Sequence, residues 1–529
     1  MAVLPWILRG PASLQILLFV FILALSTSAQ HCSKENPCAT GCCSQQGYCG
    51  TGDEFCGEGC VDTCDYKMEC DANNPCASGC CNKFGFCGFG PNYCGEDCVA
   101  GCESKAYCDP GFGAEWAEVS SCPLNACCSK SGFCGTTEEF CGDQQVKRPS
   151  CPPTNDLPRL VGYYETWSPR RRCNKFWPER IPLGVYTHII IAFAHINPET
   201  FEIQPAAKAD IDLYKRIAFF KTLDPSLKLY IGVGGWAFNN PGPTATTFSD
   251  LAASEANQRA FFKSLIKFLS TYNLDGIDID WEYPVADNRS GRPEDFKNFP
   301  KLLKNLKAAL KATGGRDGLS ITLPASYWYL QHFDIKNMDK HVDFFNIISY
   351  DLHGTWDRGN KWAGEILNAH TNLTEIATAL DLLWRNNISP QQVVLGLAFY
   401  GRAFTVADPT CTKPGCLFAS GAEAGECSNE VGILRNPEIN KIVTEKSLTW
   451  TMYEKEAVKI VHWDDQWVAY DDGDTWKIKT DFARGQCLGG VVVWAISYDT
   501  LDGTYSKDLA SVVARKFQSL PVHIEEETT

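Results

Sequence analysis

Three acids stand at alternate positions in residues 274–283, Leu-Asp-Gly-Ile-Asp-Ile-Asp-Trp-Glu-Tyr. A β-strand points successive side chains to opposite faces, so Asp278, Asp280 and Glu282 would share one face and apolar residues the other. Like charges about 7 Å apart raise one another's pKa and push at least one acid towards its protonated form. A surface strand could carry these acids, but its apolar face would then need a core. The pattern favours a catalytic strand inside a barrel, with Asp275, which has the opposite parity, in a structural role.

Eight apolar runs of strand length alternate with helical patterns between residues 159 and 515. Such runs are typical of parallel strands that are buried on both faces. They predict an α/β fold, a (β/α)8 TIM barrel with an α+β insertion at about residues 404–485. A doubly wound sheet is the alternative, but the Gly-x-Gly-x-x-Gly turn expected after its first strand is missing. The runs are residues 160–164, 188–194, 228–233, 276–281, 319–323, 344–349, 393–398 and 490–495.

The chain has the composition of an exported protein. Residues 1–29 have the pattern of a secretory signal peptide, and their apolar run is too short to cross a bilayer. The 28 cysteines suit an oxidising compartment. A net charge of -15 argues against nucleic acid and membrane as partners and favours a neutral or cationic substrate. We expect a secreted, extracellular monomer with an acidic tail at residues 516–529 and candidate glycans at Asn288, Asn372 and Asn387.

Residues 30–151 hold 23 of the 28 cysteines, in a pattern that repeats. The repeats predict three modules, at residues 30–66, 67–104 and 105–151, the third of them atypical, followed by a linker at residues 152–158. Units of about 40 residues bury too little apolar surface to be stable alone, so disulfides must replace a core. Paired Cys-Cys steps do not have the spacing of zinc ligands, so we expect no metal and no cofactor.

Each module repeats a Cys-Cys-Ser/Asn-x-x-Gly-aromatic-Cys-Gly segment, with a further aromatic before the next cysteine. On this motif the modules resemble hevein-type chitin-binding domains. The resemblance implies a shallow face on which N-acetylglucosamine rings stack, and aromatic side chains on so small a scaffold have no core to fill. The residues at these positions are Ser44, Tyr48 and Phe55 in the first module, Asn82, Phe84, Phe86 and Tyr93 in the second, and Ser129, Phe133 and Phe140 in the third.

The modules depart from the family pattern in two ways. Gln46 and Ser131 replace an aromatic, so we expect the second module to bind best, with the others adding avidity on a polymer. The alternative for Tyr48, Phe86 and Phe133 is that they only pack over disulfides. The third module also lacks one cysteine. This leaves six cysteines with fifteen possible pairings, among which the sequence does not choose: Cys151, Cys173, Cys411, Cys416, Cys427 and Cys487.

The motif Asp275-x-x-Asp278-x-Asp280-x-Glu282 is the signature of glycoside hydrolase family 18, which the chain resembles from about residue 160 to about residue 515. Together with the modules, this makes the chain similar to fungal, killer-toxin-like chitinases. The resemblance implies a chitinase that hydrolyses β-1,4 bonds between N-acetylglucosamine units and has chitin and its oligomers as partners. Internal cutting and processive cutting from an end remain open.

Most glycosidases place two carboxyl groups on opposite sides of the scissile bond. Asp280 and Glu282 share one strand face and cannot easily do so, which hints at a different attacking group. The family implies that the N-acetyl carbonyl of the substrate attacks, with net retention. By resemblance, Glu282 is the general acid and base, Asp280 orients the acetamido group, Asp278 shares a proton with Asp280, and Tyr350 aligns the carbonyl.

Further residues at predicted strand ends complete the cleft that the family implies, although core packing is the alternative for each aromatic. Gly232 and Ile348 stand where many relatives carry serine and methionine, which predicts altered tuning of the acids. An inactive chitin lectin shares the barrel but typically lacks the acid, and a wall-associated structural protein or toxin component is also compatible. The implied cleft residues are Tyr163, Phe193, Trp236, Tyr283, Asp351, Tyr400, Arg402 and Trp494.

Overall fold

The computed structural model describes residues 32–38, 41–50, 59–64, 69–152, 157–360 and 363–515. The expected signal peptide, the acidic tail, Phe55 and most of the linker lie outside the described residues. The chain divides into two compact units, residues 1–120 and 121–529. In the described part, no helix has the length and apolar character needed to cross a membrane.

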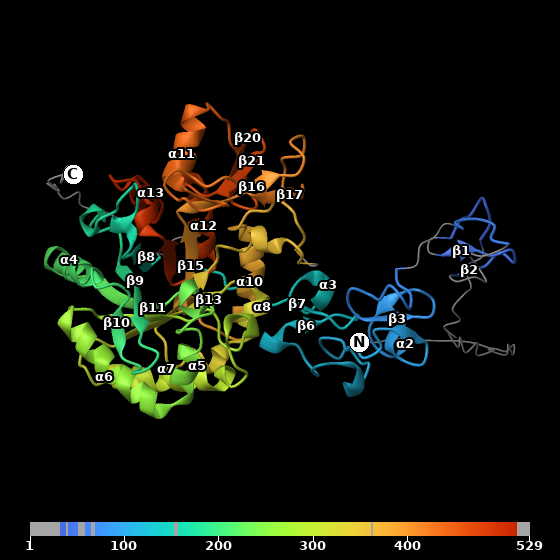
Figure 1. The fold of residues 1–529 in the computed structure, drawn as a ribbon, viewed down its shortest axis with the longest axis horizontal. Coiled ribbons are helices and arrows are strands. Elements are labelled where there is room, and N and C mark those ends of the chain that lie inside the picture. Colours follow the sequence, from blue (N-terminus) through green and yellow to red (C-terminus); the bar gives the residue numbers. More distant parts are fainter. Residues whose placement is uncertain are drawn as a thin grey trace, which may run out of the picture. The chain divides into compact units, whose positions relative to one another are not determined.

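A closed parallel barrel dominates the second unit (Figure 1). Each strand pairs with the next one along the chain, and the last returns to the first. The short strand β10 (Ile203–Pro205) adds an antiparallel edge to the second barrel strand. The predicted (β/α)8 fold is confirmed. The barrel strands are β8 (Arg159–Glu165), β9 (His188–Ile196), β11 (Lys228–Gly234), β12 (Gly276–Asp280), β13 (Gly318–Pro324), β14 (Phe344–Ile348), β15 (Val393–Ala398) and β22 (Gly490–Trp494).

Helices cover the outside of the barrel and bury one apolar stripe each against it. The main core lies between strands and helices and takes up Ile277, Ile279 and Trp281 from the outward face of β12. The inward face of β12 therefore carries the acids, as the parity of the sequence predicts. The helices are α4 (Asp210–Leu223), α5 (Thr247–Ala253), α6 (Glu255–Thr271), α7 (Asp295–Lys311), α8 (Tyr327–Leu330), α9 (Ile335–Met338), α10 (Leu373–Arg385), α12 (Gly473–Gly485) and α13 (Thr504–Val512).

An antiparallel sheet is inserted between β15 and β22 and lies at the top of Figure 1. Its first strand starts at Tyr400, directly after β15, and α12 packs against α13 and β22 as a barrel helix. The inserted sheet thus extends from residue 400 to residue 470. Its elements are β16 (Tyr400–Val406), β17 (Phe418–Gly421), β18 (Ile433–Arg435), α11 (Asn436–Glu445), β19 (Thr451–Tyr453), β20 (Val458–Trp463) and β21 (Gln466–Tyr470).

The first unit contains small modules whose cores are disulfides. The first and second modules each contain one hairpin. It is formed by β1 (Cys42–Cys43) and β2 (Cys49–Gly50) in the first module and by β3 (Cys80–Asn82) and β4 (Cys87–Gly88) in the second. The second adds β5 (Cys98–Ala100) and the short helix α2 (Pro91–Cys94). Sulfur atoms that are tied in disulfides are not available as thiolate metal ligands. The bridges that the described residues show include Cys32–Cys43, Cys38–Cys49, Cys60–Cys64, Cys70–Cys81, Cys76–Cys87, Cys80–Cys94 and Cys98–Cys102.

The second half of the third module, from residue 121 onwards, belongs to the same compact unit as the barrel. It contains the short helix η2 (Pro123–Asn125), β6 (Cys127–Cys128), β7 (Cys134–Gly135) and α3 (Glu138–Cys141). Among the cysteines that the sequence left unpaired, the bridges are Cys151–Cys487, Cys173–Cys427 and Cys411–Cys416. The first of these bridges ties the end of the module to the barrel.

The three candidate glycan sites differ in accessibility. Asn288 and Asn387 are exposed. Asn372 is 7% exposed and caps α10, where its side-chain oxygen accepts from the Thr374 amide at 3.0 Å. A glycan would be attached to the Asn372 Nδ2, which donates to Glu375 at 2.8 Å, and the buried position leaves little room for it.

Candidate active site

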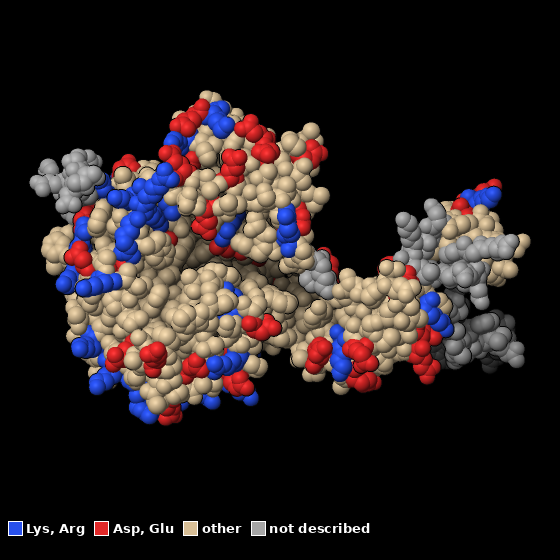
Figure 2. All heavy atoms as spheres, in the orientation of Figure 1, with Lys and Arg blue, Asp and Glu red and all other residues tan. Residues whose placement is uncertain are grey.

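The barrel strands end below the inserted sheet, where Figure 2 shows a hollow in the surface. The inward acids of β12 lie at this end, with Asp278 fully buried, Asp280 5% exposed and Glu282 9% exposed. The hydroxyl of Tyr163 donates to Asp278 at 2.7 Å. The carboxyl-terminal end of a parallel barrel is where such folds carry their chemistry.

Neighbouring strands supply further hydrogen-bond donors to the buried acids. The hydroxyl of Ser320 donates to Asp278 at 2.6 Å and that of Thr322 to Asp280 at 2.6 Å. The amide of Asn346 donates to Asp278 at 3.0 Å. The sequence analysis missed these three donors, although they occupy inward positions of otherwise apolar strands. A polar residue at an inward position of an otherwise apolar strand is the pattern by which these donors could have been predicted.

Burial raises the pKa of all three acids. The hydrogen bonds to Asp278 oppose this effect, whereas the charges of Glu282 and Asp278 add to it at Asp280, whose pKa lies well above its usual range. For Glu282, burial raises the pKa to about 7, against the opposing charge of Arg289. Glu282 can therefore hold a proton near neutral pH and give it up, which is what a general acid needs.

Tyr350 and Asp351 follow β14. Tyr350 is 9% exposed and meets the ring of Tyr400 edge-on. Asp351 accepts from the Tyr400 hydroxyl at 2.6 Å and from Arg402 Nε at 2.8 Å. Although burial acts to raise it, the Arg402 guanidinium holds the pKa of Asp351 well below its usual range. Asp351 is thus a fixed negative charge that positions the tyrosine and the arginine.

His370 supports this arrangement from behind. Its Nδ1 accepts from the backbone amide of Asp351 at 3.2 Å, which leaves Nε2 to donate to the Tyr400 carbonyl at 3.2 Å. The ring is fully buried, and burial lowers its pKa. His370 is therefore a neutral imidazole that joins the loop after β14 to the inserted sheet.

Aromatic rings form the floor of the site. Trp494 stacks on Phe193 at 5.8 Å between ring centroids and lies 5.2 Å from the ring of Tyr163. Tyr163 is 1% exposed and Phe193 8% exposed, so these two rings support Trp494, which is only partly buried. Trp167, which the sequence analysis missed, stacks on Phe193 at 6.4 Å and is exposed.

Arg289 links two loops at the rim. Its Nε donates to the Glu282 carbonyl at 2.9 Å, and it also bonds to the Trp236 carbonyl. Its guanidinium lies 3.6 Å above the ring of Trp236, which is 51% exposed. Tyr283 is 6% exposed and stacks on Tyr329 at 4.2 Å. Tyr283 is thus mostly covered, whereas Trp236 is open to a ligand.

Trp356 is a second exposed ring at the rim that the sequence analysis missed. It is 49% exposed and lies 4.6 Å from the guanidinium of Arg402. No periodic pattern marks a residue in such a loop. Gly232 makes room for the floor, because a Cβ there would lie 3.0 Å from the Phe193 ring. The hydroxyl support that Gly232 cannot give comes from β13 instead.

The modules present their predicted residues in two different ways. Tyr48 is 41% exposed and Phe84 44% exposed. Asn82 is 8% exposed, and its side-chain oxygen accepts from the amides of Phe84 and Phe86, so it shapes the turn that carries them. Ser44 and Ser129 make the equivalent bond to the amides of Tyr48 and Phe133. Tyr93 and Phe140 lie flat on the glycines of their hairpins, Gly88 and Gly135.

Comparisons with known proteins agree with this geometry. The family described as glycosyl hydrolases family 18 matches residues 159–499, and the chitin recognition protein family matches residues 112–151. A probable chitinase, LysM11, from Penicillium expansum is 34% identical over 371 residues, which are 65% of this chain and 32% of that protein. The killer toxin subunits alpha/beta of Kluyveromyces lactis are 32% identical over 333 residues, 61% of this chain and 27% of that protein. The chain thus spans about a third or less of the length of these two relatives.

A solved structure gives the same fold. Catalytic domain 2 of the Group II chitinase of Ostrinia furnacalis superposes with a TM-score of 0.61 and 26% identity, over 67% of this chain and 96% of that chain.

The raised pKa of Glu282 predicts a pH-dependent stability. Between the ordinary pKa of glutamate and about 7, the folded protein keeps a proton on Glu282 that the unfolded chain has released. Stability therefore falls as the pH rises through this interval. We expect the free energy of unfolding of the wild type to fall by an amount on the order of 3 kcal/mol between pH 4 and pH 8 because of Glu282, and Glu282→Gln to remove this fall. Denaturant unfolding at both pH values measures this free energy.

Glu294→Gln, at an exposed glutamate, is the control and should have the pH dependence of the wild type. An unchanged pH dependence in Glu282→Gln would contradict the raised pKa of Glu282.

Proposed function

This chain belongs to family 18 of the glycosyl hydrolases, and on that premise we propose that it is a secreted chitinase that cleaves β-1,4 bonds between N-acetylglucosamine units with retention. The observation that carries the proposal is the row of buried acids on β12 that ends in Glu282, whose pKa suits proton transfer near neutral pH. The exposed rings around it suit the apolar faces of sugars.

The arrangement of the acids supports attack by the substrate itself. Asp280 and Glu282 come from one short segment, so they do not flank a sugar ring as a nucleophile and an acid would. Asp351, a further acid at the site, is committed to Arg402 and Tyr400. The acetamido carbonyl oxygen of the substrate forms the bond to the anomeric carbon, while the glycosidic bond breaks and its oxygen takes the proton of Glu282.

The second step reverses the proton transfer. Glu282, now ionised, takes a proton from water, and the oxygen of that water bonds to the anomeric carbon as the acetamido oxygen leaves. Asp280, held by Thr322, accepts the acetamido N–H and stabilises the positive charge that develops. Asp278 shares a proton with Asp280, so the two titrate as a pair. Tyr350 donates to the acetamido carbonyl and aligns it for attack.

Aromatic and charged residues would hold the sugar chain along the cleft. Trp494 forms the floor under the reacting sugar, with Tyr163 and Phe193 beneath it. Trp236 and Trp356 offer further exposed rings at the rim. The other predicted cleft residues, Tyr283, Asp351, Tyr400 and Arg402, shape the walls and position Tyr350 and Glu282.

The N-terminal modules would bring the enzyme to insoluble chitin. The exposed ring of Phe84 in the second module and that of Tyr48 in the first offer surface on which sugar rings can stack. The second module carries the larger number of aromatics and should bind most tightly. Several modules on one chain raise the effective concentration of the enzyme at a polymer surface.

Replacing the acid tests the proposed reaction. Glu282→Gln keeps the shape of the side chain but cannot exchange the proton, so hydrolysis of N-acetylglucosamine hexamer should fall by at least a thousandfold, while hexamer affinity stays within about threefold. Chromatography of the products and calorimetry measure the two quantities. Glu294→Gln serves as the matched control. Wild-type-like release of chitobiose by Glu282→Gln would refute the assignment, and a wild type that binds oligomers without cleaving them would be a lectin.

A second substitution tests the role of the modules. Phe84→Ala removes an exposed ring from the second module and should reduce binding to crystalline chitin severalfold, because the stacking of this ring on a sugar face is lost. Hydrolysis of hexamer should not change. Val99→Ala, an equally exposed apolar residue of the same module, is the control in the pull-down assay. Equal binding of both variants and the wild type would remove the second module from the targeting role.

A further inference from the structure

A groove of about 390 Å³ lies where the second half of the third module meets the barrel. Residues 134–137 of the module form one wall. The other wall comes from Ala325 and Tyr327, after β13, and from Thr378 and Ala379 on α10. In Figure 1, α3 and β7 lie beside α8 and α10. The volume is at the lower end of the range for small-ligand sites, about 300–1,000 Å³.

The module wall is fixed to the barrel by contacts of several kinds. Arg148 makes a bidentate pair with Asp381 of α10, at 2.8 and 3.0 Å, and Asp381 is 7% exposed. The side chain of Asn125 donates to Asn386 at 3.2 Å, and Asn386 donates back to the Leu124 carbonyl at 2.7 Å.

Apolar packing and a covalent bond complete the attachment. Leu124, Ala126 and Val146 pack against the main core of the barrel, and the Cys151–Cys487 disulfide closes the far end of the module. Residues 121–151 of the third module are therefore part of the same compact unit as the barrel. A ligand that bridges the groove meets two walls whose spacing is set in advance, which lowers the entropic cost of binding.

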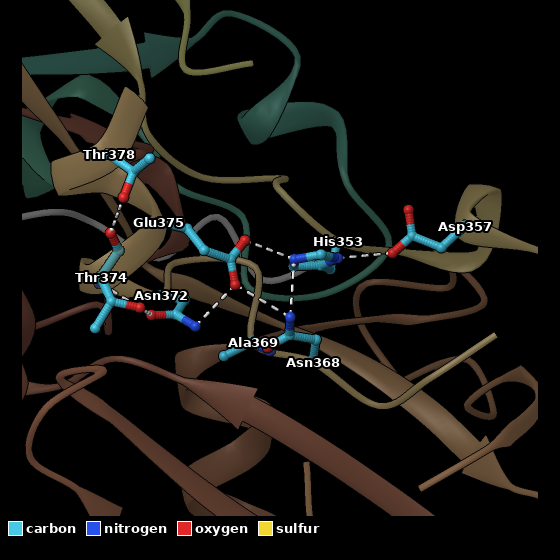
Figure 3. A network of polar contacts seen from close by, with 8 residues as sticks. All are labelled: His353, Asp357, Asn368, Ala369, Asn372, Thr374, Glu375 and Thr378. Carbon is cyan, nitrogen blue, oxygen red and sulfur yellow. Dashed lines mark hydrogen bonds and ion pairs between the residues drawn. The ribbon is translucent and has the colours of Figure 1, made fainter. Parts of the chain in front are cut away.

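The barrel wall is anchored by a polar network (Figure 3). Glu375, which also lines the groove, accepts from His353 at 2.7 Å and from Asn372 at 2.8 Å. His353 also pairs with Asp357 at 2.8 Å. Although burial acts against it, hydrogen bonds to Asp357 and Glu375 raise the pKa of His353 to about 9. The imidazolium is shared by Asp357 and Glu375, so the three groups together keep one negative charge, and Glu375 gives the groove a weakly acidic wall.

The lining chemistry suits a neutral ligand with hydroxyl and amide groups. Thr136, Thr137 and Thr378 line the groove, and the hydroxyls of Thr137 and Thr378, which donate to Glu139 and to the Thr374 carbonyl, keep the capacity to accept from a ligand. No lysine or arginine lines the groove in the described part of the chain. The ring of Tyr327 adds apolar surface to the groove, while its hydroxyl is buried and inaccessible from the groove.

The groove is connected to the catalytic strand through three successive aromatics. Tyr327 lines the groove, Trp328 is 62% exposed, and Tyr329 stacks on Tyr283, the neighbour of Glu282. These residues occupy a single turn of α8, which is about 5 Å long. The groove therefore opens close to the end of the cleft, with an exposed indole between the two.

The module side of the groove also carries sugar-recognition elements. Phe133 directly precedes the groove residue Cys134, and the ring of Phe140 lies flat on Gly135, which lines the groove. These residues fall within the match to the chitin recognition protein family at residues 112–151.

We propose that this seam groove binds a segment of the same N-acetylglucosamine chain that occupies the catalytic cleft, so that residues 121–151 of the third module are a fixed extension of the cleft. The inference rests on the proposed function and adds a binding site to it. A long chain would contact the cleft, the Trp328 indole and the groove together, whereas a short oligomer would fill the cleft alone.

Filling the groove tests the proposal in the full-length protein. Ala379→Trp from the barrel wall and Thr136→Trp from the module wall each place an indole in the groove. We expect KM for N-acetylglucosamine hexamer to rise at least fivefold, with kcat unchanged and with both constants for the trimer unchanged. Calorimetry in the Glu282→Gln background should show the same loss of hexamer affinity. Ala256→Trp, at an exposed alanine of α6, is the matched control and should behave as the wild type.

Two outcomes would overturn the proposal. Groove variants that match Ala256→Trp on the hexamer would show that no chain enters the groove. Loss of trimer hydrolysis would also count against it, because an extension of the cleft must leave short substrates untouched. If the wild type cleaves no oligomer, the proposed function fails, and hexamer binding to the wild type and to Ala379→Trp still decides whether the groove is a site.

Discussion

The burial of three carboxyl groups on the inward face of one short strand is the constraint on which the site depends. A buried ionised carboxylate without partners is strongly unfavourable, so such groups take up protons or are surrounded by hydrogen-bond donors. The protein uses both solutions. Asp278 has three donors from three other strands, Asp280 has one, and Glu282 remains protonated up to near neutral pH. The cost of burying a charged carboxylate destabilises the fold, but it also raises the pKa of Glu282 into the range that proton transfer needs.

The rest of the barrel is arranged to maintain this condition. The outward residues of β12 fill the core between strands and helices, which fixes the strand and therefore the direction of the acids. The inserted sheet contributes Tyr400 and Arg402, whose contacts with Asp351 hold the loop that carries Tyr350. Arg289 joins the loops after β11 and β12 over the ring of Trp236. Packing, charge and aromatic contacts thus act on the same few side chains.

Much of this arrangement could be predicted from the sequence because the barrel strands are apolar runs and the acids keep strict parity. The strand ranges and the inward direction of Asp278 agree with that reasoning. The pairing of Cys151 with Cys487 could not be predicted, since it joins residues 336 positions apart that only the folded barrel brings together. Arg289 and Trp356 lie in single 3-10 turns, which are too short for a sequence period to indicate which way a side chain points. The burial of the Ser44 and Asn82 side-chain oxygens could not be predicted either. Each oxygen could hydrogen-bond to a sugar, but in the structure it accepts from a backbone amide of its own turn.

The central claim is that the acetamido group of the substrate, and not a second carboxylate of the protein, attacks the anomeric carbon. The configuration of the first product tests it most directly. Proton NMR of N-acetylglucosamine hexamer during the first minutes of hydrolysis, before mutarotation, reports the anomer of each new reducing end. The account predicts the β-anomer, because attack by the acetamido group followed by water gives net retention. The α-anomer as the first product would require direct attack by water and would contradict the account.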